Sequence, residues 1–162
     1  MGKSSLLNAL AGRRSLARVS AAPGKTELLN VYRTPQAYLL DLPGYGWARR
    51  SQAARAGFRR LVESVATRRS GLRGVLWLLD IRHPPSDDDQ AIQDLLAETS
   101  RPVLVVLTKT DKLPRARRAA ALARRASELG LDREMLLTTS STTGLGIGEL
   151  RESIAALAGA AR

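Results

Sequence analysis

Residues 102–111, Pro-Val-Leu-Val-Val-Leu-Thr-Lys-Thr-Asp, join a continuous apolar run to a short polar motif. A run of this length favours a strand that is buried on both faces, as in a parallel sheet covered by helices. Ligands bind at the carboxyl edge of such a sheet, where Thr108, Lys109, Thr110 and Asp111 would lie. A carboxylate there can accept hydrogen bonds from N1–H and the 2-amino group of guanine, a pair of donors that adenine lacks. The motif therefore favours a guanine site, with a solvated loop as the alternative.

Alternating strands and helices surround this stretch. Apolar runs predict four other strands, at residues 28–34, 37–41, 74–81 and 134–139. One helical pattern begins after residue 2, and three others occupy residues 51–69, 115–129 and 148–158. Ser86 and Asp89 predict the capped start of one more helix. This order predicts a single α/β domain over residues 1–162, with a doubly wound, mostly parallel sheet.

The composition limits the classes of protein that fit. The chain has 162 residues, of which 44% are apolar, enough for one folded core. It has no cysteine and a single histidine, which excludes disulfide scaffolds, thiolate metal sites and two-histidine metal sites. No apolar run reaches ~18 residues and the N-terminus has no secretory layout, so a cytoplasmic protein without a membrane segment is expected. The net charge of +11 predicts an acidic partner, of which nucleic acid is the usual one.

The chain opens with Met1-Gly2-Lys3-Ser4-Ser5 ahead of a helical segment. Gly-Lys-Ser at the start of a helix is the second half of a phosphate-binding loop. Gly2 lets the backbone approach a phosphate, Lys3 supplies positive charge, and the Ser4 hydroxyl can bind magnesium, while Ser5 extends the row of N-terminal donors. The first half of this fingerprint is missing, so a chance match is the alternative.

A second candidate for phosphate chemistry is Asp41-Leu42-Pro43-Gly44, which follows the predicted 37–41 strand. Asp41 can hold magnesium through a water molecule, and the N–H of Gly44 can face a terminal phosphate. A strand-ending turn is the alternative, because Asp, Pro and Gly favour turns. The position of this motif about 37 residues after Gly-Lys-Ser, with the expected strand before it, favours the site.

Four weaker signals complete the pattern. In Pro23-Gly24-Lys25-Thr26, the threonine could complete a magnesium shell, with a plain turn as the alternative. Thr139, Ser140 and Ser141 end the fifth strand, where backbone N–H groups could contact the 6-oxo group of guanine. His83 is expected to be a structural loop residue rather than a general base. The arginine-rich face of residues 51–69 could follow a phosphate backbone or could simply be solvated.

These motifs, in this order, resemble those of the translation-factor-related GTPases. The segments PGKT (23–26), DLPGYG (41–46), DIRHPP (80–85), TKTDK (108–112) and SSTTGLG (140–146) resemble the EngB (YihA/YsxC) family of bacterial ribosome-biogenesis GTP-binding proteins. The resemblance implies a Ras-like P-loop GTPase fold that binds GTP or GDP with Mg²⁺ and hydrolyses GTP slowly. It also implies a monomer that acts in assembly of the large (50S) ribosomal subunit, with a role in cell division and septation.

The resemblance also assigns roles to individual residues. Lys3 and Ser4 would bind phosphate and Mg²⁺, and Thr26 would be the switch threonine that also binds Mg²⁺. Asp41 and Gly44 would sense the γ-phosphate. The base would be read by three residues, Thr108, Lys109 and Asp111.

Two departures from the family pattern carry expectations of their own. Tyr45 stands where many GTPases have a water-orienting glutamine, so intrinsic hydrolysis should be slow, with the ribosomal particle or a potassium ion supplying what is missing. Met1 stands within the family's phosphate loop, where Val is expected. We therefore expect this chain to lack the first half of that loop and a central strand between 37–41 and 74–81, and to bind GTP poorly, whereas an upstream-extended product would be a GTPase.

Two other functions compete with a GTPase switch. The first is a basic ribosome- or RNA-binding module with impaired nucleotide binding, which the charge and the incomplete phosphate loop favour. The second is an ATP-dependent P-loop kinase, against which the motif at residues 108–111 argues.

Overall fold

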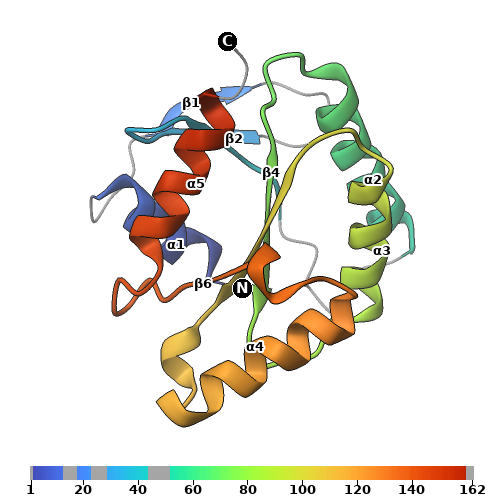
Figure 1. Ribbon diagram of the computed structural model, residues 1–162. Helices are drawn as coiled ribbons and strands as arrows, with labels where there is room; N and C mark the ends of the chain where they lie inside the picture. The colour runs from blue at the N-terminus through green and yellow to red at the C-terminus, as the bar shows by residue number, and fades with distance from the viewer. Residues whose placement is uncertain (1, 13–17, 23–28, 44–51, 160–162) are drawn as a thin grey trace.

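The computed structural model describes residues 2–12, 18–22, 29–43 and 52–159. Within these ranges the chain forms two three-stranded sheets with helices packed around them (Figure 1). The helices are α1 (Lys3–Ala11), α2 (Gln52–Arg68), α3 (Asp87–Ala97), α4 (Arg115–Leu129) and α5 (Ile147–Gly159). The strands are β1 (Arg18–Ala22), β2 (Leu29–Arg33), β3 (Tyr38–Asp41), β4 (Val75–Asp80), β5 (Val103–Thr108) and β6 (Leu136–Thr138). Two 3₁₀ turns, η1 (Thr110–Lys112) and η2 (Arg133–Met135), precede α4 and β6.

The sheet that carries the site consists of β4, β5 and β6, which are parallel. Asp80 lies opposite Thr108 in the register, so the carboxyl ends of β4 and β5 coincide. Trp77 and Leu107 pack with α2, α3 and α4 on one face, whereas Val106 packs with α1 and α5 on the other. The expectation of strands buried between two helical layers is therefore confirmed, and Figure 1 shows α2 and α3 across the sheet from α1 and α5.

The second sheet is antiparallel, in the order β1-β2-β3. Strands β2 and β3 were expected, but β1 was not. Its sequence, Arg-Val-Ser-Ala-Ala, has neither a continuous apolar run nor a clear alternation of apolar and polar residues. Its pairing with β2, which includes a register shift between Arg18 and Ser20, gives it strand structure. Pairing with the next strand thus decides an element that the residues of β1 do not reveal by themselves.

Among the described residues, β3 and β4 are not hydrogen-bonded to each other, and the two sheets are separate. A cavity of about 230 Å³ lies between them, lined mainly by apolar side chains from α1, β3, α2 and β4. Leu6, Leu40, Val62 and Leu76 are among these side chains. The interruption of the sheet falls between the two strands where the sequence predicted it.

The helix boundaries follow the local signals closely. Ser86 accepts a hydrogen bond from the N–H of Asp89, and the Asp89 carboxylate accepts one from the N–H of Ser86, so the predicted cap of α3 is a complete capping box. Helix α4 has the predicted bounds. Strand β6 is shorter than expected because residues 133–135 form η2.

Helix α1 is held in place by α5. Leu6 and Leu10 are buried against Leu150 and Ile154. The Arg151 guanidinium donates hydrogen bonds to two carbonyl groups at the end of α1, those of Ala9 and Leu10, at 2.7 and 3.2 Å. These bonds satisfy acceptors that a helix end leaves free. The C-terminal end of α1 is consequently fixed relative to α5.

In the part of the chain that the structure describes, no helix is both long and apolar enough to cross a membrane.

Candidate functional site

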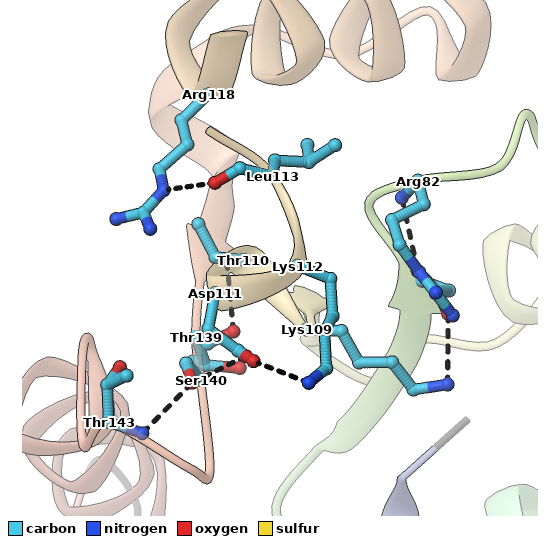
Figure 2. A network of polar contacts seen from close by, with 11 residues as sticks. Arg82, Lys109, Thr110, Asp111, Lys112, Leu113, Arg118, Thr139, Ser140 and Thr143 are labelled. Atoms are coloured by element: carbon cyan, nitrogen blue, oxygen red, sulfur yellow. Dashed lines mark hydrogen bonds and ion pairs between the residues drawn. The ribbon is translucent and has the colours of Figure 1, made fainter. Parts of the chain in front are cut away.

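The loop that follows β5 is built around two buried threonines. The Thr108 hydroxyl donates to the carbonyl of Leu79. The Thr110 hydroxyl and N–H both donate to the carbonyl of Thr139, and Figure 2 shows Thr110 and Thr139 side by side. The side chains of Thr108 and Thr110 are almost completely buried. Their hydroxyl groups therefore join the loop to β4 and to the end of β6, and this leaves the side chains of Lys109 and Asp111 to face a ligand.

Asp111 is the acidic residue of this loop and is anchored from the β6 side. Its Oδ1 accepts a 2.7 Å hydrogen bond from the Ser140 hydroxyl, and its Oδ2 lies 3.4 Å from the Lys112 ammonium (Figure 2). The Ser140 hydrogen bond, with a smaller contribution from Lys112, holds the pKa of Asp111 below its usual value, although burial opposes the shift. The carboxylate is therefore charged and orientated, as a group that accepts hydrogen bonds from a base must be.

The loop after β6 contributes a side-chain hydroxyl to the site, and not the backbone N–H groups of Thr139 and Ser140 that the sequence suggested. The N–H groups of Thr139 and Ser140 donate to the carbonyls of Leu107 and Leu145, at 2.8 and 2.9 Å, so neither is available to a base. Ser140 acts through its hydroxyl instead. Of the three predicted residues, Ser141 alone has an N–H group with no partner among the described residues.

The phosphate-binding candidates lie at the start of α1. Gly2 is the N-cap of the helix with φ of 80°, a left-handed conformation that glycine adopts without strain. Ser4 and Ser5 are exposed in the first helical turn. The Lys3 ammonium lies 2.7 Å from Oδ1 of Asp41, at the end of β3, and donates a hydrogen bond to the carbonyl of Leu42. Two motifs that are 38 residues apart in the sequence (41 − 3) thus meet at one place.

Lys109 connects the phosphate side of the site with the base side. Its Cε lies 3.6 Å from the position that a Cβ atom on Gly2 would take. Its ammonium lies 3.0 Å from Oδ2 of Asp80, at the carboxyl end of β4. The lysine side chain therefore passes close to the start of α1 on its way to Asp80, while Asp111 lies on the same loop.

Asp80 and Arg82 were not among the predicted site residues. Arg82 donates its Nε and its backbone N–H to Oδ1 of Asp80, at 2.9 and 3.1 Å, and its Nη2 to Oδ2 at 2.8 Å. The sequence did single out the DIRHPP segment, but for His83, which is exposed and whose N–H donates to the carbonyl of Asp80. An acidic residue at the carboxyl end of a strand next to β5 was the signal that could have found Asp80.

The charge of Asp80 is maintained by its partners. Burial by itself would raise the pKa of Asp80, but the hydrogen bonds from Arg82 and Lys109, together with the Lys109 charge, outweigh burial and hold this pKa well below its ordinary value. The pKa of Arg82 is raised, chiefly by its hydrogen bond to Asp80, with a smaller contribution from the charge of Asp111. The charge of Asp80 therefore interacts with those of Arg82 and Lys109. The charge of Arg82 also interacts with that of Asp111.

Several predicted residues lie outside the described ranges. These are Gly24, Lys25, Thr26 and Gly44. Their roles, and those of Tyr45, stay predictions from the sequence. Pro43 is described and is half-buried beside Leu42, on the rim of the cavity between the two sheets.

The donor atoms of the residues present are suitable ligands for a magnesium ion. The Ser4 hydroxyl and the Asp41 carboxylate are hard oxygen ligands of the kind that Mg²⁺ prefers. Oδ1 of Asp41 is buried and has no hydrogen-bond partner among the described residues, although it is paired with the Lys3 charge. In the same residues no group of three or more acidic or histidine side chains could hold a metal ion.

The arrangement can hold an anion at one end and a planar hydrogen-bonding group at the other. Lys3 and the N-terminus of α1 attract phosphate, since the first N–H groups of a helix are unpaired and its dipole favours negative charge. Asp111 accepts hydrogen bonds at the other end, and the stem of Lys109 lies between them. A nucleotide has this combination of groups.

Comparisons with known proteins agree with this geometry. Residues 1–109 match the sequence model of the family described as "50S ribosome-binding GTPase". A protein of Syntrophomonas wolfei named "Probable GTP-binding protein EngB" is 44% identical over 158 residues, covering 97% of this chain and 81% of that protein. A protein of the same name from Gemmatimonas aurantiaca is 41% identical and covers 95% of this chain and 76% of its own length.

Solved structures show the same fold. The structure of a probable GTP-binding protein EngB has a TM-score of 0.70 and 17% identity, and the match covers 97% of this chain and 92% of that one. Era in complex with MgGDPNP and nucleotides 1506–1542 of 16S ribosomal RNA has a TM-score of 0.64 and 24% identity, over 95% of this chain and 52% of Era. Both likenesses confirm the P-loop GTPase fold that the sequence predicted.

Proposed function

The chain belongs to the EngB family of GTP-binding proteins, and we propose that it acts as a GTP-dependent switch in assembly of the large (50S) ribosomal subunit. In this proposal it works in the cytoplasm as a monomer, hydrolyses GTP slowly and supports normal cell division and septation. The slow rate follows from Tyr45, which cannot orientate water as a glutamine does, so that the particle or a potassium ion completes the site.

One observation carries the nucleotide part of the proposal. The Lys109 side chain joins the start of α1 to the loop after β5, because it lies over Gly2 while Asp111 is held by Ser140 on the same loop. A guanine nucleotide bound along this line would place its base at Asp111 and its phosphates at Lys3. Adenine offers no pair of donors to Asp111, so the site rejects it.

Magnesium would be held by Ser4 and Thr26, with Asp41 contributing through a water molecule. When bound, the ion neutralises charge on the phosphate oxygens. The chain's own residues place a positive charge where the phosphates would bind. Lys3 pairs with Asp41 and donates to the carbonyl of Leu42 in the structure described here, so its ammonium is already at the junction of α1 and β3, where a terminal phosphate would be sensed.

The ribosomal part of the proposal is supported by charge and by the family description. A net charge of +11 favours association with ribosomal RNA, which is the most abundant polyanion on a ribosomal particle. The switch follows from phosphate chemistry, since a γ-phosphate can order the loops around Thr26 and Gly44, and hydrolysis releases them. The ordered loops would bind the particle and their release would end the association.

Sedimentation of the chain with purified large ribosomal subunits tests this function. We expect the chain to pellet with 50S particles when a non-hydrolysable GTP analogue is supplied at a concentration high enough to offset the weak GTP binding expected from its sequence. At the same concentration of GDP or of an ATP analogue it should stay in the supernatant. Small subunits serve as the control particle. Equal pelleting with every nucleotide would contradict a GTP-dependent switch.

A second candidate function is the basic ribosome- or RNA-binding module. The observation that favours it is the surface of α4, where three arginines, Arg115, Arg117 and Arg124, are exposed and form no ion pair with another described residue. The sedimentation assay distinguishes the two functions, because such a module binds the particle without nucleotide and releases it as salt is raised.

A further inference from the structure

We propose that Asp80, clamped by Arg82, is a positioning residue that fixes the side chain of Lys109 for binding guanine. This inference rests on the proposed function, because it concerns the same nucleotide site. It assigns a role to two residues that lie outside the phosphate-binding and base-reading motifs.

The Asp80 carboxylate is fully engaged by two cationic residues. Both of its oxygens accept from the Arg82 guanidinium, which approaches as a two-pronged fork, and Oδ2 is also within 3.0 Å of the Lys109 ammonium. Such charge-assisted pairs are short and directional. The side chain of Asp80 is only 14% exposed, so water competes little for its oxygens. The end of β4 therefore presents a carboxylate whose orientation is set by Arg82 and whose remaining capacity is given to Lys109.

Lys109 needs such an anchor. Its φ of 62° is the only positive value found at a residue other than glycine in the described ranges, and residues with a side chain are strained there. Its backbone carbonyl accepts from the N–H of Lys112, the last residue of η1, so the backbone is fixed by the turn. The long side chain would be free if its ammonium had no partner. Asp80 provides that partner across the sheet edge, from β4 to the loop after β5.

The result is a lysine stem laid over Gly2 in a defined position. A lysine that is ordered only on binding loses side-chain entropy at that moment, which weakens affinity. A lysine ordered in advance by Asp80 avoids this loss and offers its methylene groups to the flat face of a purine. The charge of Asp111 also makes a small contribution to the raised pKa of Arg82.

The first test needs no nucleotide and uses the lysine side chains themselves. The chain has four lysines, and Lys112 lies on the same loop as Lys109 with 58% of its side chain exposed. We expect acetylation by N-acetoxysuccinimide, followed by mass spectrometry, to modify Lys109 more slowly than Lys112. In Asp80→Asn the ratio of the Lys109 rate to the Lys112 rate should rise at least about twofold, because the ammonium loses a charge-assisted partner. An unchanged ratio would overturn the proposal.

The matched control is Asp94→Asn. Asp94 is exposed on α3, and its substitution makes the same change in charge away from the site. This variant should leave the acetylation ratio and the affinity for GDP as they are in the unmodified chain. A rise of the ratio in Asp94→Asn equal to that in Asp80→Asn would show that net charge, and not the clamp, controls Lys109.

The second test separates positioning from a merely structural role. Asp80→Asn should raise the dissociation constant of fluorescent GDP about tenfold, the loss expected when a lysine must be ordered on binding. In a Lys109→Met background the same substitution should add less than about twofold, since its effect acts through Lys109. Equal losses in both backgrounds would overturn the positioning role. A chain whose unmodified form shows no preference for GDP over ADP would instead contradict the proposed function, while the acetylation ratio would still decide the clamp.

Discussion

The Ser140 hydroxyl donates a 2.7 Å hydrogen bond to Oδ1 of Asp111, a residue 29 positions earlier in the chain. This bond joins the loop after β6 to the loop after β5 (Figure 2). The carboxylate that is proposed to read guanine is therefore held from a second loop, and its direction depends on the shape of both.

Removal of this hydroxyl is the first prediction. Ser140→Ala should weaken GDP binding about fivefold to tenfold, because one charge-assisted hydrogen bond no longer orientates the carboxylate. Fluorescence titration with labelled GDP measures the change. Ser127→Ala, at an exposed position on α4, is the control and should bind as the unmodified chain does. Unaltered affinity in Ser140→Ala would show that Asp111 needs no such support.

A second prediction concerns the glycine that shapes the same loop. Gly146 has φ of 69°, and a Cβ atom there would lie 2.0 Å from the carbonyl oxygen of Thr138. Gly146→Ala should lower the free energy of unfolding by about 3 kcal/mol or more, because backbone strain is added to a clash with main chain. Urea unfolding followed by circular dichroism measures this.

Gly144 provides the matched control for that substitution. Its φ is 78°, but no atom lies within 4 Å of the place where a Cβ would stand. Gly144→Ala should therefore cost only the strain of the left-handed backbone, about 1 kcal/mol. Similar losses in the two variants would mean that the contact with Thr138 relaxes at little cost.

The third prediction is a pH dependence caused by Asp80. Its pKa is lowered in the folded chain, so the unfolded chain binds the proton more readily. The stabilisation is therefore fully present above the ordinary aspartate value of about 3.9 and is lost progressively as pH falls below it. The gap in unfolding free energy between the unmodified chain and Asp80→Asn should be largest at neutral pH and should shrink in acid. Urea unfolding at several pH values measures this gap, and a gap independent of pH would contradict the lowered pKa.

The sequence predicted the parallel sheet well because its strands are continuous apolar runs. Residues 75–80 and 103–108 are buried on both faces, and such burial leaves a pattern that is visible without a structure. The bounds of α4 and the capping box at Ser86 were also predictable, since helix signals are local. Strand β1 was missed because its pairing with β2 is a non-local property that its own residues do not encode clearly.

The site was predictable where it follows a motif and was missed where it depends on contacts across the sheet. Lys3 contacts Asp41, and the Lys109 side chain lies close to Gly2, so motifs that are distant in the sequence meet in the structure. The binding roles of these residues and of Asp111 stay predictions. The engagement of the Thr139 and Ser140 N–H groups by other carbonyls could not be seen in the sequence, because it depends on how the loop closes. The position of Asp80 at the carboxyl end of a predicted strand was a visible signal, but its contact with Lys109 depends on the register of β4 with β5.

The most direct measurement of the central claim is a competition assay, in which unlabelled nucleotides displace fluorescent GDP from the chain. GDP should displace the probe at a concentration at least about a hundredfold lower than ADP, since adenine leaves Asp111 unpaired. Asp111→Asn should bind xanthosine diphosphate in preference to GDP. Xanthine has a 2-oxo group in place of the 2-amino group of guanine, and an amide can donate a hydrogen bond to it. Equal displacement by GDP and ADP, or an unchanged preference in Asp111→Asn, would contradict the assignment of Asp111 as the residue that reads guanine.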